Sequence, residues 1–456
     1  MKSKFQNVTG KCVDLSFEGK GVVKLSYGTV FVDGLFLGEE AEIEIQYKRA
    51  GSYFGKVHRL ITKSPDRIQP LCGVCTACGG CQFQQYAYPS QLKYKTNKVK
   101  DAFRRHGLDV KVNDTLGMDK PYEYRNKIQV PIGRDPHGHI VSGFYRSGTH
   151  KIIPIEKCYI ENPKASKIIE EFKRLIKDFR YEPYNEDTGY GLFRHVLIRT
   201  SYHYDDIMVT LVTTQDAFKG KNNFVHEFVK RCPNIKCLVQ NINPRDTNVI
   251  LGNKERILYG SGHIKDSILG IDFLISSKSF YQVNPVQVET LYSKAIEFAE
   301  LKQTDEVFDA YCGIGTISLI AAKKAKHVVG VEIVKEAIID AKRNAKLNQI
   351  DNCDFICDDA PKAFESLVFD NKKFDVVFVD PPRKGVDEKM IETLLRLKPK
   401  KIVYVSCEPE TLARDVALLS KEYSIKKIQP VDMFPMTFHC ETVVSLMLKN
   451  SEKIVK

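Results

Sequence analysis

The sequence predicts an α/β protein with a doubly wound, Rossmann-like C-terminal sheet, preceded by a small β-barrel and a central α+β region. From about residue 290, short apolar segments typical of buried strands alternate with helical segments, as in mostly parallel sheets. Residues 7–62 read instead as short strands separated by glycines, and residues 122–280 mix strand-like and helical segments. These changes of pattern predict three domains, at residues 1–62, 63–280 and 281–456.

Composition limits the class of protein. The chain of 456 residues has no stretch near 18 consecutive apolar residues and no apolar signal region at its N-terminus. We therefore expect a cytoplasmic protein without a membrane partner, and no obligate protein partner is evident. The net charge of +12 favours a polyanionic partner such as nucleic acid, although many lysine-rich proteins are basic without binding one. Thirteen cysteines in such a chain indicate metal ligands or catalysis rather than disulfides.

The N-terminal segment is expected to close into the barrel. Residues 41–46 alternate apolar and polar side chains, as a half-buried strand does, and the glycines around them indicate turns. The segment resembles the TRAM domain, an OB-like RNA-binding barrel, in Gly19-Lys-Gly-Val-Val23, Val30-Phe-Val32 and Gly38-Glu39. A small barrel can equally be a structural appendage.

Four cysteines at three-residue intervals give a strong metal signal: Cys72, Cys75, Cys78 and Cys81. Zinc sites usually take two such pairs separated by a longer loop. Closely repeated Cys-x-x-Cys with glycines is typical of iron–sulfur clusters, whose fourth ligand often comes from elsewhere in the chain. Spacing alone nominates all four local residues.

Residues 91–106 form a helical pattern that carries six basic residues with Tyr94 among them. The lysines and arginines could follow an RNA phosphate backbone. They could also be an ordinary solvated helix face, and charge alone favours neither interpretation.

The C-terminal strands are expected at residues 306–309, 327–331, 374–379 and 401–405, with a helix at 335–347. The loop Asp309-Ala-Tyr311-Cys-Gly313-Ile-Gly315 closes the first strand, and its glycines let the backbone approach a ligand. Glu332 ends the next strand 17 residues after Gly315, where a carboxylate can bind a ribose diol. The third glycine of the dinucleotide fingerprint is absent, which suits a nucleoside ligand without a pyrophosphate, such as S-adenosylmethionine.

Asp380-Pro-Pro-Arg383 ends the third strand of this sheet. Amino-directed DNA and RNA methyltransferases use a similar Asp/Asn-Pro-Pro, followed by an aromatic residue that stacks on the target base. Arg383 takes that place here, which counts against methylation of an amino group.

Cys407 follows the last of these strands, and Pro409 prevents the strand from continuing. By position alone, a small core residue is its more common role. A thiolate there could also add to carbon 6 of a pyrimidine and make carbon 5 nucleophilic enough to accept a methyl group. A base must then remove the proton on carbon 5, and Glu441 is the candidate.

Together these motifs resemble the RNA uracil-5-methyltransferase family, and within it the TRAM-bearing, iron–sulfur branch that modifies 23S ribosomal RNA. The resemblance covers nearly the whole chain. It implies that Cys407 is the nucleophile and Glu441 the proton acceptor. It also implies that Gln282, Tyr311, Glu332 and Asp380 contact S-adenosylmethionine or surround its methyl group, and that Phe280 shapes the pocket for an extruded base. The motifs that carry it are Cys72-x5-Cys78-Gly-Gly-Cys81, Phe280-Tyr-Gln282-Val-Asn284, Asp309-x-x-Cys-Gly-x-Gly315, Asp380-Pro-Pro-Arg383, Ser406-Cys407-x-Pro409 and His439-x-Glu441.

The resemblance also implies a [4Fe–4S] cluster bound by Cys72, Cys78, Cys81 and the distant Cys158, with Cys75 as an extra thiol that keeps the local set of four possible. The expected partner is RNA, first of all 23S rRNA. The same reaction on the T-loop uridine of tRNA is the alternative substrate. A non-catalytic RNA-binding assembly factor is the remaining alternative.

Overall fold

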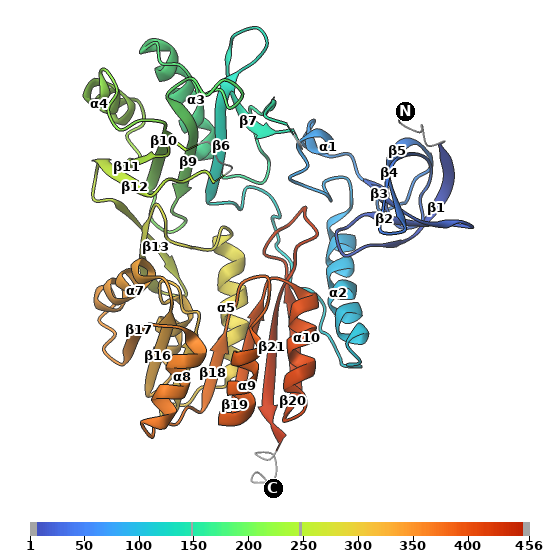
Figure 1. Ribbon diagram of the computed structural model, residues 1–456, viewed down its shortest axis with the longest axis vertical. Helices are drawn as coiled ribbons and strands as arrows, with labels where there is room; N and C mark the ends of the chain where they lie inside the picture. The colour runs from blue at the N-terminus through green and yellow to red at the C-terminus, as the bar shows by residue number, and fades with distance from the viewer. Residues whose placement is uncertain (1–6, 147–148, 246–248, 450–456) are drawn as a thin grey trace.

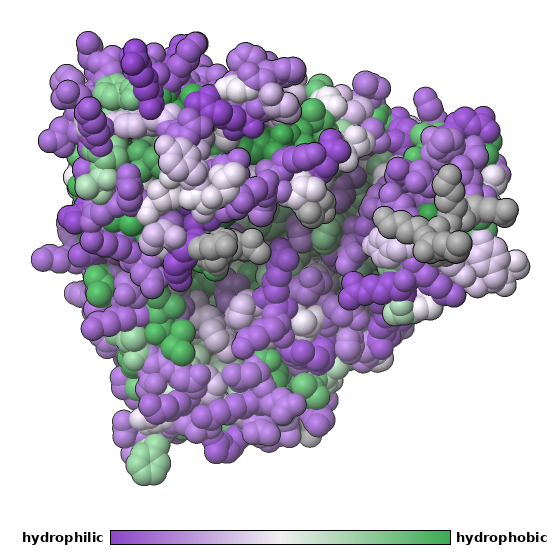
Figure 2. All heavy atoms as spheres, turned by 45° about the horizontal axis from the view of Figure 1, so that its top comes forward, coloured by the Kyte–Doolittle hydropathy of each residue, from purple (hydrophilic) through white to green (hydrophobic). Residues whose placement is uncertain are grey.

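The computed structural model describes residues 7–146, 149–245 and 249–449 and confirms the predicted fold class (Figure 1). A small barrel, a central sheet and a C-terminal sheet follow one another along the chain, and the barrel stands to one side of the other two. Figure 2 shows the barrel as a lobe beside the body of the protein, on a face that is mainly hydrophilic. In the ranges that the structure describes, no helix is long and apolar enough to cross a membrane.

The barrel closes around an apolar core that includes Val23, Val30, Val32, Ile43 and Ile45. Alternate residues of its strands point inward, as the sequence pattern predicts. Its strands are β1 (Val8–Leu15), β2 (Gly21–Leu25), β3 (Gly28–Asp33), β4 (Glu40–Arg49) and β5 (Ser52–Thr62), in the closed order β1-β2-β3-β5-β4.

The central sheet is covered by helices α3 (Pro163–Asp178) and α4 (Lys221–Arg231), whose Phe172 and Phe228 pack on Val196 and Ile198 of the sheet. Most of the residues of β9 and β10 are buried, because these strands lie inside the sheet. The strand order is β12-β11-β10-β9-β6-β7-β8. The strands are β6 (Lys127–Arg134), β7 (Ile140–Tyr145), β8 (Ile152–Pro154), β9 (Phe193–Thr200), β10 (Ile207–Thr213), β11 (Ile235–Ile242) and β12 (Lys254–Tyr259).

A hairpin joins the central sheet to the C-terminal sheet. Its strands β13 (His263–Ile268) and β14 (Ile271–Ser276) contribute Ile264 and Phe273 to one continuous core. The same core contains Met208 of β10 and Val288 of α5 (Pro285–Ala299). The two sheets are therefore connected by apolar packing as well as by the chain.

The C-terminal sheet is doubly wound, as expected from the alternating pattern. Helices α5, α6 (Thr316–Ala322) and α7 (Lys335–Leu347) cover one face, and α8 (Ala360–Phe369), α9 (Glu388–Leu397) and α10 (Pro409–Leu419) cover the other. Strands β15 to β19 are parallel to one another, and β21 is antiparallel to both β19 and β20. The order β17-β16-β15-β18-β19-β21-β20 is formed by β15 (Glu306–Ala310), β16 (His327–Glu332), β17 (Cys353–Cys357), β18 (Val376–Val379), β19 (Lys401–Ser406), β20 (Tyr423–Val431) and β21 (Glu441–Leu448).

Helix α2 (Tyr88–Arg105), which follows the short helix α1 (Cys75–Cys78), corrects the interpretation of two of the six basic residues, Lys95 and Lys98, whereas the other four are exposed or half-buried. It packs beside α10 on the C-terminal sheet, through Val99 and Phe103 (Figure 1). Lys95 is 0% exposed and Lys98 is 5% exposed, so neither lysine follows an RNA backbone or faces solvent. Basic composition could not reveal this, because the partners of both lysines lie more than 300 residues away in the sequence.

The segment after α2 extends the C-terminal sheet at its edge. The Leu116 N–H donates to the Pro430 carbonyl (3.0 Å), and the Asp432 N–H donates back to the Leu116 carbonyl (2.8 Å). Residues that the sequence assigned to the central domain thus pack against the strand that leads into residues 432–440.

A buried ion pair fixes residues 432–440, which we call the 432–440 loop. The Lys95 ammonium contacts the Asp432 carboxylate and donates to the Phe434 carbonyl (3.1 Å). The Tyr88 hydroxyl donates to the same carboxylate (2.8 Å), and Gln91 accepts from the Met436 N–H (3.0 Å). Because both charges are fully buried, each depends on the other for compensation.

We predict that Lys95→Met lowers the free energy of unfolding by about 3–5 kcal/mol, because Asp432 keeps a buried charge without its partner. Lys93 lies on the same helix and is exposed, so Lys93→Met should change stability by no more than about 0.5 kcal/mol. Urea titrations followed by circular dichroism would measure both. Equal effects of the two substitutions would contradict a structural role for the pair.

Candidate active site

A cavity of about 720 Å³ opens at the carboxyl ends of the parallel strands of the C-terminal sheet. Open α/β sheets bind ligands at this edge, and the size is typical of a small-molecule site. The structure brings to this one cavity every residue that the sequence assigned to catalysis or to cofactor binding: Gln282, Tyr311, Glu332, Asp380, Cys407 and Glu441.

The loop between β15 and α6 has an unusual backbone. Tyr311, Gly313 and Gly315 all have positive φ, of 67°, 55° and 84°. A Cβ on Gly315 would lie 2.8 Å from the Phe355 ring, so glycine is required there. Left-handed backbone at a non-glycine residue such as Tyr311 is uncommon and is found at ligand sites. The loop can therefore bring its backbone close to a bound molecule.

Glu332, at the end of β16, is held by the backbone on both sides. Its carboxylate accepts hydrogen bonds from the Gly313 N–H (3.3 Å) and from the Val334 N–H (2.9 Å). These bonds orient the carboxylate at the cavity wall, where it can receive further donors such as a ribose diol. Asp358 and Asp359 line the cavity after the neighbouring strand β17, and the sequence analysis did not identify them.

Cys407 and Glu441 lie on neighbouring strands. The antiparallel register of β19 and β21 pairs Ser406 with Thr442, so the next position on each strand is Cys407 on one and Glu441 on the other. Pro409 begins α10 and ends the strand, which leaves Cys407 half-buried at the cavity. Strand pairing therefore brings together two residues that are distant in the sequence.

Both residues have strongly perturbed acidities. Burial raises the pKa of the Cys407 thiol to about 12, and the neighbouring carboxyls of Glu441 and Asp380 contribute in the same direction. Burial raises the pKa of Glu441 to about 8, and Asp380 adds to it. Arg383 opposes both shifts. Burial also raises the pKa of Asp380 to about 7. Perturbed groups that share a cavity are typical of functional sites.

From the sequence, Arg383 stood out only as the replacement of an aromatic residue, whereas in the structure it is a cation that faces Cys407 and Glu441. Helix α10 holds the loop that carries it: the Thr411 hydroxyl donates to the Arg383 carbonyl (3.1 Å), and Arg414 donates to the Lys384 carbonyl (3.0 Å). A cation among buried acids is the signal that could have identified it.

Aromatic and imidazole side chains complete the cavity. Phe280 lines it and is 73% exposed, so its ring is available for contact with a ligand. Phe434 and His439 come from the 432–440 loop. Burial lowers the pKa of His439 to about 4, with help from Arg383 and the lysines of α2, so this imidazole is neutral at pH 7.

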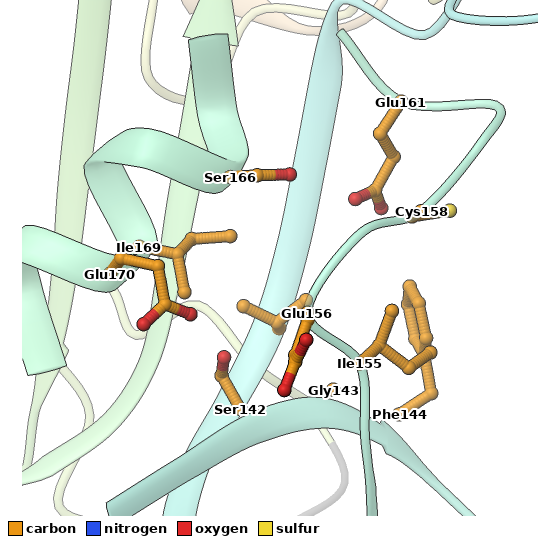
Figure 3. Close-up of a pocket in the computed structure, with 11 residues that line it drawn as sticks. Ser142, Gly143, Phe144, Ile155, Glu156, Cys158, Glu161, Ser166, Ile169 and Glu170 are labelled. Atoms are coloured by element: carbon orange, nitrogen blue, oxygen red, sulfur yellow. The ribbon is translucent and has the colours of Figure 1, made fainter. Parts of the chain in front are cut away.

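The predicted metal ligands lie away from this cavity, between the barrel and the central sheet. Cys81 and Cys158 pack against the same small apolar cluster of Tyr124, Ile160 and Met436, although 77 residues separate them. In Figure 3, Cys158 and Glu161 project from the same loop beside a small pocket. Burial raises the pKa of the Cys158 thiol to about 12, and the neighbouring Glu161 carboxyl adds to this rise, while backbone N–H groups of Ile160 and Glu161 oppose it.

The local cysteines have similar surroundings. Burial raises the pKa of Cys78, and the Gly80 N–H opposes this shift through a hydrogen bond to the sulfur. Across residues 7–146, 149–245 and 249–449, no three His, Cys, Asp or Glu side chains are arranged to hold a metal ion. The ligand set Cys72, Cys78, Cys81 and Cys158 therefore remains a prediction.

Comparison with known proteins identifies relatives along nearly the whole chain. A family model described as tRNA (uracil-5-)-methyltransferase matches residues 88–449. A protein of Halalkalibacterium halodurans described as an uncharacterized RNA methyltransferase is 44% identical over 440 residues, which cover 96% of each chain. One of Staphylococcus aureus (strain MSSA476) with the same description is 43% identical over 443 residues, covering 97% of this chain and 98% of the relative.

A solved structure is also similar over nearly the full length of the chain. It is the Pyrococcus abyssi tRNA (uracil-54, C5)-methyltransferase in complex with S-adenosyl-L-homocysteine. The TM-score is 0.80 at 29% sequence identity, over 96% of this chain and 100% of that chain.

We predict that Glu441→Gln raises the thermal midpoint relative to the wild type, by an amount that grows between pH 5 and pH 8. The unfolded state loses the Glu441 proton near pH 4.5, whereas the folded state keeps it to about pH 8, so stability falls with rising pH in this window. Glutamine stays neutral and removes that fall. Glu392→Gln, on the exposed face of α9, is the control and should follow the wild type at every pH. A constant difference between Glu441→Gln and the wild type would contradict the raised pKa.

Proposed function

The chain belongs to the tRNA (uracil-5-)-methyltransferase family of S-adenosylmethionine-dependent RNA-modifying enzymes, and we propose that it methylates carbon 5 of a uridine in 23S ribosomal RNA through a covalent cysteine–uracil adduct. One observation carries this proposal: Cys407 and Glu441 line the same cavity as the cofactor loop and Asp380. We expect an enzyme that acts on this RNA to be located in the cytoplasm.

The cavity fits S-adenosylmethionine as methyl donor. The backbone of the Tyr311–Gly315 loop can approach the ligand closely, and the fixed Glu332 carboxylate would bind its ribose. S-adenosylmethionine supplies a methyl group on a positively charged sulfur. Gln282 and Asp380 would lie beside that sulfur, where the partial negative charge of their oxygens is favourable.

Cys407 would form the bond that activates the base. Its sulfur adds to carbon 6 of the uracil, and the electrons of the 5,6 double bond move toward oxygen 4 to form an enolate. Carbon 5 of this enolate accepts the methyl group, and S-adenosylhomocysteine leaves. The thiol, whose pKa burial raises to about 12, first gives its proton to water, and the positive charge of Arg383 favours the resulting thiolate.

Glu441 would complete the reaction. Its carboxylate takes the proton from carbon 5, the double bond re-forms, and the carbon–sulfur bond breaks to release 5-methyluridine and the Cys407 thiolate. A base with a pKa of about 8 is well matched to this step near neutral pH. Removal of this proton is the step that frees the enzyme from the RNA.

The uridine must leave its stack before the sulfur can reach carbon 6, which costs a few kcal/mol. Phe280, exposed at the cavity, is placed to stack on the extruded base and offset part of this cost. The Asp380-Pro-Pro motif is followed by Arg383 instead of an aromatic residue, so the partner for the base would come from the Phe280 segment.

A second substrate, the T-loop uridine of tRNA, is favoured by the likeness to the Pyrococcus abyssi tRNA enzyme. That likeness spans 96% of this chain, so possession of a barrel does not separate the two substrates. The cysteine-rich segment, on which the resemblance to the 23S rRNA branch depends, favours ribosomal RNA.

We also propose that Cys72, Cys78, Cys81 and Cys158 bind a [4Fe–4S] cluster. The donor set suits such a cluster, and backbone N–H groups at Cys78 and Cys158 would offset part of the rise in pKa that burial causes at these two thiols. Bound there, a cluster would link the segment after the barrel to the central sheet. Methyl transfer requires no electrons, so we expect it to support folding or RNA binding.

We predict that the wild type forms a covalent complex with 23S rRNA fragments that contain 5-fluorouridine, and that Cys407→Ala forms none. In 5-fluorouridine a fluorine replaces the carbon 5 proton that the base must remove, so elimination is blocked and the adduct accumulates. Denaturing gels and mass spectrometry would detect it. Cys357→Ala, which changes an exposed thiol outside the cavity lining, should still form the adduct.

The same assay on tRNA decides between the substrates. An adduct with tRNA but not with 23S rRNA would replace our first substrate by the second. An adduct that survives in Cys407→Ala would rule out the mechanism.

For the metal, we predict that Cys158→Ser lowers the iron and sulfide content of anaerobically purified protein to a small fraction of the wild-type value. Cys75→Ser should keep about four iron atoms per chain. Loss of iron only in Cys75→Ser would assign the cluster to the four local cysteines instead. A wild type without iron or sulfide would refute the cluster itself.

A further inference from the structure

The imidazole of His439 is a polar group of the cavity that the reaction described above does not use. His439 is half-buried and lines the cavity together with Cys407 and Glu441. Its backbone N–H donates to the Thr437 hydroxyl (3.3 Å), whereas its ring nitrogens form no hydrogen bond with another residue that the structure describes. A neutral imidazole has one N–H donor and one acceptor nitrogen, so a donor is available to a ligand in the cavity.

His439 and Glu441 face the same side of the chain. Cys440, which lies between them, is 1% exposed and packs into the core beneath the sheet, while its two neighbours line the cavity. This alternation is typical of an extended chain, in which residues two positions apart are roughly 7 Å from each other. Glu441 is the first residue of β21, so His439 lies one step beyond the proposed base, outside the edge of the sheet.

Aromatic neighbours fix the position of the imidazole. The Phe438 and His439 ring centroids are 4.2 Å apart, and Phe434 meets His439 at 6.0 Å with an interplanar angle of 72°. Lys98 holds Phe438 from helix α2, because its ammonium donates to the Phe438 carbonyl (3.1 Å) and lies 5.0 Å from the centre of the Phe438 ring. The imidazole is therefore in place before a ligand binds, as a group that stabilises charge without rearrangement must be.

The surroundings of His439 favour a hydrogen-bond donor over a base. Burial lowers the pKa of His439 to about 4. The positive charges of Arg383, Lys98 and Lys95 act in the same direction, and they also polarise the N–H bond of the neutral ring. A neutral imidazole of this kind can polarise a carbonyl group. It would be a weak acceptor for the Cys407 proton, since a general base works best with a pKa near the operating pH.

The proposed reaction creates a negative charge that needs such a donor. When the Cys407 sulfur shares an electron pair with carbon 6, the 5,6 pair forms a 4,5 double bond and the carbonyl pair moves onto oxygen 4. Carbon 4 is the ring neighbour of carbon 5, which Glu441 must reach, so a group beside Glu441 is placed for oxygen 4. When carbon 5 bonds to the methyl group, the oxygen 4 carbonyl re-forms. The proton of the donor stays on its nitrogen throughout.

We propose that His439 is a catalytic residue whose imidazole N–H donates a hydrogen bond to oxygen 4 of the uracil and stabilises the enolate that the addition of Cys407 produces. The inference rests on the proposed function and deepens it, since it assigns the group that meets this charge. Oxygen 4 carries far more charge in the enolate than in free uridine. The hydrogen bond should therefore raise the rate of methyl transfer more than the affinity for RNA.

Two substitutions separate the donor from the ring. His439→Phe keeps a planar ring against Phe438 and removes the N–H, whereas His439→Gln keeps an N–H donor. The measurement is single-turnover methyl transfer to 23S rRNA fragments and to tRNA, with RNA and S-adenosylmethionine saturating.

On the RNA that the wild type modifies, His439→Phe should be slower by about 100- to 1,000-fold, the loss expected for one oxyanion donor. Its affinity for RNA should stay within about threefold of the wild type. His439→Gln should be at least about tenfold faster than His439→Phe. His226→Phe, at an exposed position on α4 outside the cavity, is the control and should react like the wild type. A His439→Phe enzyme as fast as the wild type, or as fast as His439→Gln, would overturn the proposal.

An atomic substitution in the RNA locates the contact. In 4-thiouridine, sulfur replaces oxygen 4 and is a poorer hydrogen-bond acceptor. Placed at the target position, it should slow the wild type at least about fivefold more than it slows His439→Phe, because the intrinsic effect of sulfur on the ring is common to both proteins. 2-thiouridine is the control and should slow both proteins equally. His439→Leu takes the place of His439→Phe if the phenylalanine variant does not fold.

Equal effects of 4-thiouridine on the two proteins would overturn the proposal, as would a difference seen with 2-thiouridine instead. A wild type that methylates neither RNA would refute the proposed function and this inference with it. A wild type that methylates RNA, beside a His439→Phe variant of equal rate, would refute the inference alone.

Discussion

The buried ion pair between Lys95 and Asp432 is the contact through which the N-terminal half of the chain shapes the cavity. Lys95 belongs to a helix that precedes the central sheet, and Asp432 begins the loop that brings Phe434 and His439 to the cavity. A charge without a partner would be costly at this depth, so loop and helix hold each other in one arrangement. Glu441 follows directly, as the first residue of β21. The position of the proposed base thus depends on a residue more than 300 positions earlier.

The electrostatics of the cavity follow from the same burial. Burial raises the pKa of both Asp380 and Glu441, and the Asp380 carboxyl raises that of Glu441 further, so both keep protons to about pH 7 or pH 8. Arg383 is the cation that opposes this effect, and helix α10 fixes its backbone. A proposed nucleophile and a proposed base in such surroundings are kept neutral until RNA and cofactor enter. Thiolate formation and proton removal are therefore the steps most sensitive to charge changes near Arg383.

Local sequence patterns predicted the fold class because the strands of the C-terminal sheet are apolar runs bounded by turn residues. They also indicated the cavity residues, since Glu332 ends a strand and Tyr311, Asp380 and Cys407 each follow one, and parallel strands end at one edge. The role of α2 could not be predicted, because the local sequence does not distinguish a buried lysine from a solvent-exposed one. Their partners are supplied by tertiary packing alone. The cysteine ligands stay a prediction for a related reason. The spacing of Cys72, Cys75, Cys78 and Cys81 indicates ligands that are close in the sequence, but it cannot show whether a distant thiol such as Cys158 is the fourth.

The most direct test of the central claim is to map 5-methyluridine in ribosomal and transfer RNA from cells that lack this protein. The account predicts that the modification disappears from 23S rRNA, that the wild-type protein restores it, and that Cys407→Ala does not. Unchanged 5-methyluridine in both RNAs, or restoration by Cys407→Ala, would contradict the account.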